Sequence, residues 1–252
     1  YQTQETMPVL LASFDSGKMH NAIPRDGIAV FAIPEDKKED IRIAWNIFTS
    51  EVEDEFHVTD TSIVAKMEST EPMKIIQPEV AANIIRSLQA VDNGVFSMCQ
   101  DKELEWIVET SSNVASVSTN DAELNVVASQ RSNVMSRLQA MANTVKATFQ
   151  LAGAEITQGD GYPAWKMNPN SQLVKVTVDA YKKLFGKEPK VLGIHAGLEC
   201  GLFSEKYPQL DMVSFGPTLR FVHTPDERLY IPTVQMVWNH LIEILKNIPE
   251  KK

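Results

Sequence analysis

The residues most able to do chemistry lie together in the stretch 191–231, which holds two histidines, a thiol and several acids. His195, Glu199 and Cys200 fall in one glycine-rich turn, and His223 falls in a second turn. Imidazole can bind a metal or move a proton, and a thiol beside an imidazole can act as a nucleophile. Loops on a rigid scaffold often carry such groups. The stretch therefore predicts a functional site.

Residue types alone leave each candidate with an ordinary structural interpretation. His223 reads as a loop histidine bonded to a local carbonyl or acid, because no second ligand lies at metal-site spacing. Cys200 reads as a small buried hydrophobe. Arg131, between an expected strand and an expected helix, is either a surface arginine or a bidentate partner for a carboxylate. Asn21 and Asn113 are weaker candidates, since asparagine before a turn is usually structural.

The elements that must position these residues change in pattern at the turn 159–163. Before it, strands are mixed with segregated helices, which predicts an α+β domain with a largely antiparallel sheet. After it, helices alternate with short strands, which is typical of an α/β segment. We therefore expect two domains, 1–158 and 159–252. The expected strands are 8–14, 28–33, 62–69, 106–117, 122–129, 191–194 and 212–215. The expected helices begin near residues 34, 78, 132, 171, 198 and 232.

Composition excludes several classes of protein. The net charge of −9 disfavours nucleic acid and anionic membranes as partners. No apolar stretch is long enough to cross a bilayer. The two cysteines, Cys99 and Cys200, lie far apart with no metal-site spacing. We expect a reduced, cytoplasmic chain that binds neither nucleic acid nor membrane.

Short segments along nearly the whole chain carry a resemblance to a known family. They are HNAIPRD (20–26), ETSSNVASV (109–117), SQRS (129–132), GYPAW (161–165), HAGLECG (195–201), DMVSFGPT (211–218) and HTPDE (223–227). In this combination they resemble the C-terminal part of the aminoacyl-histidine dipeptidases. These are peptidase D-like enzymes among the co-catalytic zinc exopeptidases, related to carboxypeptidase G and carnosinase.

The resemblance implies hydrolysis of Xaa-His dipeptides of the carnosine type by a metal-activated water, with two zinc ions per site. His223 matches a ligand of one zinc, and Asp226 or Glu227 could hold its other ring nitrogen. The family's other ligands include a His-x-Asp motif and a Glu-Glu pair, and neither occurs in this sequence. We therefore expect a C-terminal part of a longer dipeptidase, with its general base elsewhere. Alone it should be inactive and bind no metal.

The resemblance also implies contacts to a dipeptide substrate. Arg131 matches an arginine that grips the C-terminal carboxylate of the substrate. Asn21 matches a residue near the substrate, reaching the site of a neighbouring subunit. The other implied substrate-binding residues are Asn113, His195, Gly197 and Glu199. Residues 1–158 would be an N-terminally incomplete lid domain that pairs two subunits into a homodimer, and 159–252 the last segment of the catalytic domain.

Two other functions stay open. Residues 1–158 have a full set of expected strands and helices but no catalytic cluster, which fits a non-catalytic binding or dimerisation module. Dimerisation of that region without metal or substrate would favour this alternative. A thiol hydrolase would use Cys200 and a histidine. Inhibition by iodoacetamide without any effect of a chelator would favour that one.

Overall fold

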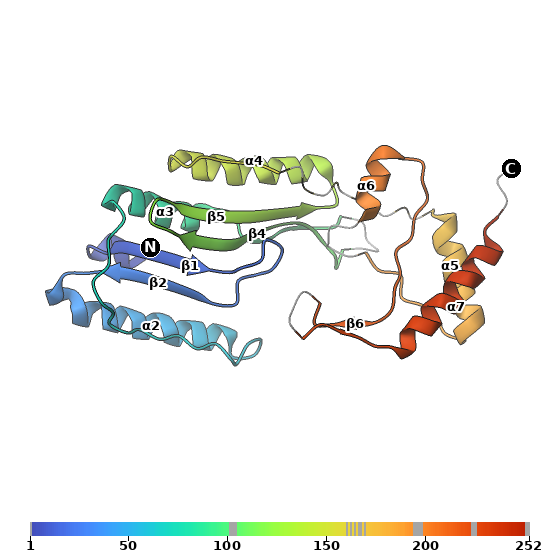
Figure 1. The fold of residues 1–252 in the computed structure, drawn as a ribbon, viewed down its shortest axis with the longest axis horizontal. Helices are drawn as coiled ribbons and strands as arrows, with labels where there is room; N and C mark the ends of the chain where they lie inside the picture. Colours follow the sequence, from blue (N-terminus) through green and yellow to red (C-terminus); the bar gives the residue numbers. More distant parts are fainter. Residues whose placement is uncertain are drawn as a thin grey trace. The chain divides into compact units, whose positions relative to one another are not determined.

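The structure is a computed structural model that describes residues 2–100, 105–159, 161, 163, 165, 168, 170–193, 199–222 and 226–249. Figure 1 shows its elements in chain order. The helices are α1 (Gln2–Thr6), the 3-10 helix η1 (Glu35–Lys37), α2 (Lys38–Phe56), α3 (Pro78–Ala90), α4 (Met135–Leu151), α5 (Gln172–Phe185), α6 (Glu199–Lys206) and α7 (Pro232–Asn247). The strands are β1 (Leu10–Ser16), β2 (Gly27–Ala32), β3 (Gly94–Met98), β4 (Val108–Thr119), β5 (Leu124–Ser132), β6 (Leu219–Arg220) and β7 (Arg228–Leu229).

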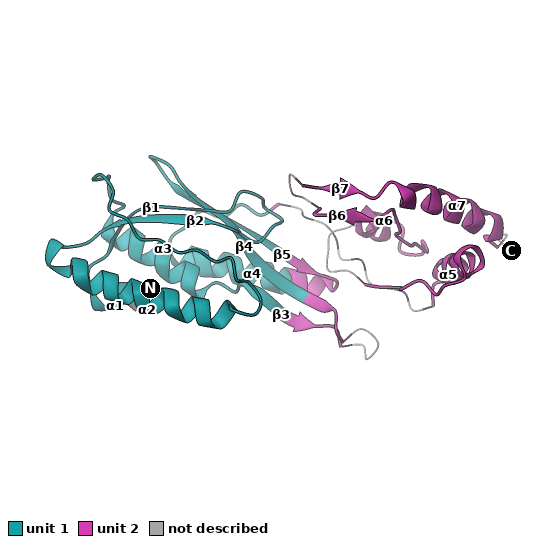
Figure 2. Ribbon diagram, turned by 90° about the horizontal axis from the view of Figure 1, so that it is seen from below, with its two compact units in different colours: residues 1–96, 110–130, 139–158 teal, residues 97–109, 131–138, 159–252 magenta. Residues whose placement is uncertain are grey.

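The chain forms two compact units, coloured separately in Figure 2. Unit 1 comprises residues 1–96, 110–130 and 139–158. Unit 2 comprises residues 97–109, 131–138 and 159–252. The division is therefore not a single cut in the chain, because two short segments from the first half of the sequence group with the C-terminal residues.

The five-stranded sheet has the order β2-β1-β4-β3, and β5 also pairs with β4. Strands β1 and β2 pair antiparallel from Leu10 opposite Ala32 to Ser16 opposite Gly27, with a register shift between Leu11 and Ser13. Such a shift bends a strand and increases its twist. Between β1 and β4, which also run antiparallel, Ser16 lies opposite Val117.

Side chains strengthen this short pairing between β1 and β4. The hydroxyl of Thr119 accepts a 2.9 Å hydrogen bond from the backbone N–H of Phe14 and donates a 3.0 Å bond to its carbonyl oxygen. The carboxylate of Asp15 accepts a 2.9 Å bond from the backbone N–H of Thr119. These contacts satisfy backbone groups that would otherwise need a longer strand ladder.

The core of unit 1 lies where α4 and the end of α3 meet the β4–β5 hairpin. Its buried residues are Val91, Met141, Val145 and Phe149, packed against Leu88, Val114, Val126, Ala128 and Ile156. The apolar positions of α4 recur at helical spacing, so one face of the helix is buried. In the view of Figure 1, α4 and α2 lie on opposite sides of the strands.

In unit 2, helices α5 and α7 pack against each other. Ser171 caps α5 by accepting a 3.0 Å hydrogen bond from the N–H of Val174, and Gly186 ends the helix at φ +63°. His240 of α7 is buried, and its Nε2 lies 2.8 Å from the carbonyl oxygen of Thr177 on α5. His240 is therefore a structural histidine between the two helices.

The mixed α/β fold with an antiparallel sheet confirms the expected fold class. Several local expectations were wrong. Residues 62–69 and 212–215 form no strand, and strands β3, β6 and β7 were not expected. The strand expected at 191–194 is not formed by residues 191–193, and residue 194 lies outside the described part. No helix in the described part of the chain is long and apolar enough to span a membrane.

Candidate functional site

In unit 1, the structure brings together two segments that carry candidate residues. Gly17 ends β1 at φ +67°, and the following loop holds Asn21. The side-chain amide of Asn113 on β4 donates a 2.9 Å hydrogen bond to the backbone carbonyl of Ala22, next to Asn21. Both asparagines are half-buried. The loop is thus fastened to the sheet beside the residue proposed to lie near the substrate.

In unit 2, Arg131 lies at the end of β5, where the chain turns into α4. It is half-buried, and the next residue, Ser132, accepts a 3.1 Å hydrogen bond from the backbone N–H of Val134. This bond shapes the turn before α4 begins at Met135. The expectation that Ser132 begins the helix as its cap was wrong, because β5 extends to Ser132 and α4 begins three residues later, at Met135.

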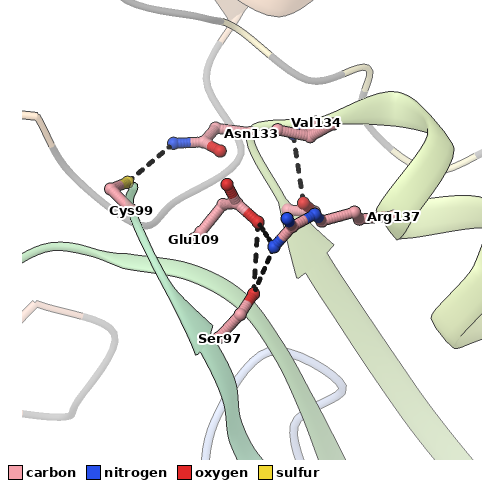
Figure 3. A network of polar contacts seen from close by, with 7 residues as sticks. Ser97, Cys99, Glu109, Asn133, Val134 and Arg137 are labelled. Atoms are coloured by element: carbon pink, nitrogen blue, oxygen red, sulfur yellow. Dashed lines mark hydrogen bonds and ion pairs between the residues drawn. The ribbon is translucent and has the colours of Figure 1, made fainter. Parts of the chain in front are cut away.

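A polar network that the sequence did not predict braces the same turn (Figure 3). The carboxylate of Glu109 forms an ion pair with Arg137, and the hydroxyl of Ser97 donates a 3.1 Å hydrogen bond to it. Asn133 donates a 3.3 Å bond to the sulfur of Cys99. The partners are far apart in the sequence, so neither spacing nor periodicity could have paired them.

Helix α6 begins at Glu199, whose side chain is exposed, and continues with Cys200. Burial first, and the charge of Glu199 second, raise the pKa of the Cys200 thiol. A raised pKa lowers the fraction of thiolate at neutral pH, which disfavours Cys200 as a nucleophile. Both cysteines are free thiols, so they form no disulfide.

The remaining candidates, His195, Gly197 and His223, lie outside the described residues. Among the described residues, no group of three or more His, Cys, Asp or Glu side chains is placed to hold a metal ion. A catalytic zinc needs about three protein ligands together. The described side chains alone therefore do not fit a zinc centre.

The chain is similar in sequence and in fold to known proteins. Residues 15–247 match the peptidase family M20/M25/M40. The chain is 33% identical over 248 residues to the cytosol non-specific dipeptidase of Escherichia coli (strain K12), covering 98% of this chain and 51% of that protein. The crystal structure of the aminoacylhistidine dipeptidase from Vibrio alginolyticus superimposes with a TM-score of 0.82 at 34% identity, over 98% of this chain and 50% of that one. The chain thus spans about half the length of these relatives.

Proposed function

Because the chain belongs to the M20/M25/M40 peptidase family, we propose that it forms part of a zinc-dependent dipeptidase that cleaves Xaa-His dipeptides. The observation that carries the proposal is the alignment of 98% of the chain with two proteins that are named as dipeptidases. One of those names specifies aminoacylhistidine substrates and the other specifies no preference. The Xaa-His preference draws its further support from the HAGLECG and HTPDE segments.

In this proposal the chain contributes substrate contacts. The guanidinium of Arg131 binds the C-terminal carboxylate of the dipeptide, because its planar donors match a carboxylate bidentately. Asn21, held by the hydrogen bond between Asn113 and Ala22, lies near the substrate. Glu199 binds the amino group or the imidazole of the dipeptide. His195 and Gly197 also bind the dipeptide.

We also propose that His223 is a zinc ligand and that the other ligands and the general base lie on sequence that the longer relatives have and this chain lacks. The support is the lack of an H-x-D motif and of a Glu-Glu pair in the sequence. A single imidazole does not hold catalytic zinc tightly. The chain alone should therefore bind no zinc firmly and hydrolyse no dipeptide.

The experiment measures zinc stoichiometry by elemental analysis after dialysis, together with hydrolysis of β-alanyl-histidine by the same sample. The expected result is no retained zinc and no turnover above that of a His223→Ala control. About two zinc ions per chain together with turnover would overturn the proposed division of ligands.

A second experiment tests Arg131 without requiring turnover. Binding of β-alanyl-histidine is followed by NMR and compared with binding of the same dipeptide carrying a C-terminal amide. If Arg131 binds the carboxylate, Arg131→Ala should weaken binding of the acid by about tenfold or more and leave binding of the amide unchanged. Equal losses for both ligands would contradict the assignment.

We further propose that the protein is cytoplasmic and forms a homodimer through unit 1. Strand β2 lies at one end of the strand order, and its Ile28 is 70% exposed. Helix α2 of the same unit exposes Ile43, Ile47 and Phe48 by more than half. Sedimentation should detect a dimer that Ile47→Glu weakens and that Leu151→Glu, on the 91% exposed end of α4, does not. A monomer at all concentrations would contradict it.

A further inference from the structure

Glu109 is a nearly buried carboxylate in unit 2 whose role the proposed function does not assign. Its side chain is 8% exposed and its Oε1 lies 2.5 Å from Nη1 of Arg137, whose side chain is 38% exposed. The hydroxyl of Ser97 donates a 3.1 Å hydrogen bond to the same Oε1 and accepts a 3.3 Å bond from Arg137 (Figure 3). A buried carboxylate destabilises the fold unless it keeps its hydrogen-bond and ion-pair partners.

The backbone around this carboxylate is joined to the same turn. The carbonyl oxygen of Glu109 accepts a 3.2 Å hydrogen bond from the backbone N–H of Asn133. The Asn133 side chain donates to the sulfur of buried Cys99 at 3.3 Å, and the N–H of Cys99 donates a 2.9 Å bond to the carbonyl of Ile107. Ser97, Cys99 and Glu109 therefore contact the segment 131–138 at Asn133 and at Arg137.

This arrangement favours precision of position over stability. Buried ion pairs contribute little net stability, because desolvation offsets the attraction, but their loss leaves an unpaired buried charge. The charged pair is directional, since the guanidinium and the hydroxyl both point at one carboxylate oxygen. Arg131 begins the segment that this pair fixes. A binding arginine at the end of a strand needs such support, because small displacements weaken a bidentate contact.

We propose that Glu109 is a positioning residue that acts through Arg137, Ser97 and Asn133 to hold the segment 131–138, and with it Arg131 at the end of β5, in its substrate-binding position. The inference rests on the proposed role of Arg131. Glu109 itself does not touch the substrate. Its carboxylate orders the 131–138 segment. Binding of a substrate carboxylate by the Arg131 guanidinium then carries a smaller entropic cost, because this segment is already ordered.

The test measures amide hydrogen exchange in residues 131–138 of the full chain. Glu109→Gln and Arg137→Gln should each speed exchange there by about tenfold or more, which is the loss expected for hydrogen bonds to a charged group. Arg137→Lys, which keeps the charge, should restore part of the protection. Glu243→Gln is the matched control, because Glu243 is also buried and paired with a lysine, Lys183, but lies on α7. It should leave 131–138 unchanged.

Binding of β-alanyl-histidine in the same variants separates the two claims. Faster exchange in 131–138 together with at least about tenfold weaker binding supports the positioning role toward the substrate. Unchanged exchange in both Glu109→Gln and Arg137→Gln overturns it, whatever the ligand does. A third outcome is faster exchange in the variants while even the unmodified chain does not bind the dipeptide. That outcome supports the ordering of the 131–138 segment by Glu109 and refutes the proposed role of Arg131. If Glu109→Gln does not fold, the partly exposed Arg137→Gln carries the test.

Discussion

The side-chain amide of Asn113 donates a 2.9 Å hydrogen bond to the backbone carbonyl of Ala22, although 91 positions separate the two residues. Asn113 is in the middle of β4, and Ala22 is in the loop after β1. A strand is a rigid support, so the bond gives the loop a fixed point on the sheet. The position of the neighbouring Asn21 is therefore determined by the strand as well as by the loop.

Asn113→Ala should therefore loosen the loop. The variant removes one side-chain-to-backbone hydrogen bond, so the free energy of unfolding should fall by about 1 kcal/mol. Hydrogen exchange should quicken in residues 18–26. Asn125→Ala is the control, because exposed Asn125 bonds only to nearby Glu123 at 2.9 Å among its described contacts. Equal effects of the two variants on the loop would contradict the fastening role.

Gly17 should be irreplaceable at the start of the same loop. Its φ is +67°, and a Cβ there would lie 2.1 Å from the backbone oxygen of buried Ala115. A backbone oxygen within the sheet cannot move aside as a flexible side chain can. Gly17→Ala should lower the free energy of unfolding by at least about 3 kcal/mol, from strain and overlap together. Denaturant titration measures this loss.

Gly186→Ala provides the matched comparison. Gly186 has φ +63°, but a Cβ there would meet no atom within 4 Å. Only the conformational cost applies, which is about 1–2 kcal/mol. If Gly17→Ala cost no more than Gly186→Ala, close approach to Ala115 would not be the reason for glycine at position 17.

The elements that the sequence predicted well are those with strong local signals. Helix α5 has a serine cap and a terminal glycine, and α3 and α7 each begin with proline. The prediction of a strand at 62–69 failed because it rested on alternation of apolar and polar residues. Alternation shows only that a strand there would have two different faces, and a strand also needs a partner strand. Within the described part of the chain, the sheets do not include these residues.

Candidate residues could be named from the sequence, but their contacts could not be predicted. Substrate contacts for Arg131 and Asn113 were implied only by resemblance to a family and stay a prediction, since a lone arginine or asparagine has many ordinary roles. The pairing of Glu109 with Arg137 joins residues 28 positions apart, and that of Asn113 with Ala22 joins residues 91 apart. Such contacts depend on strand pairing, which local patterns do not encode.

The pH dependence of stability should reveal the tie between Asp211 and the start of α5. Burial alone would raise the pKa of Asp211, but hydrogen bonds from the backbone N–H of Leu173 at 2.9 Å and from Ser171, Gln172 and Met212 lower it overall. A pKa lower in the folded than in the unfolded chain gives stability that is present above the unfolded value of about 3.9. That stability is lost as the pH falls through the folded value.

Asp211→Asn should thus be less stable than the unchanged chain at neutral pH, and the difference should shrink below about pH 4. The measurement is the free energy of unfolding by urea across this range. Ser62 lowers the pKa of Asp60, and Lys183 lowers the pKa of Glu243. Both carboxyl groups are present in the two proteins, so their contributions to the free energy of unfolding cancel in the difference. A difference that stays constant with pH would exclude ionised Asp211 as its source.

The two compact units have separate buried residues, so core substitutions should open one unit at a time. Met141 in unit 1 and Ile244 in unit 2 are both 3% exposed, and truncation of either to alanine should cost about 2–5 kcal/mol. Met141→Ala should speed hydrogen exchange in α4 and in residues 114–128 while leaving α5 and α7 protected, and Ile244→Ala should do the reverse. Each variant serves as the control for the other. If both variants opened both units equally, the chain would unfold as one cooperative body, and the two cores would not stabilise their units independently.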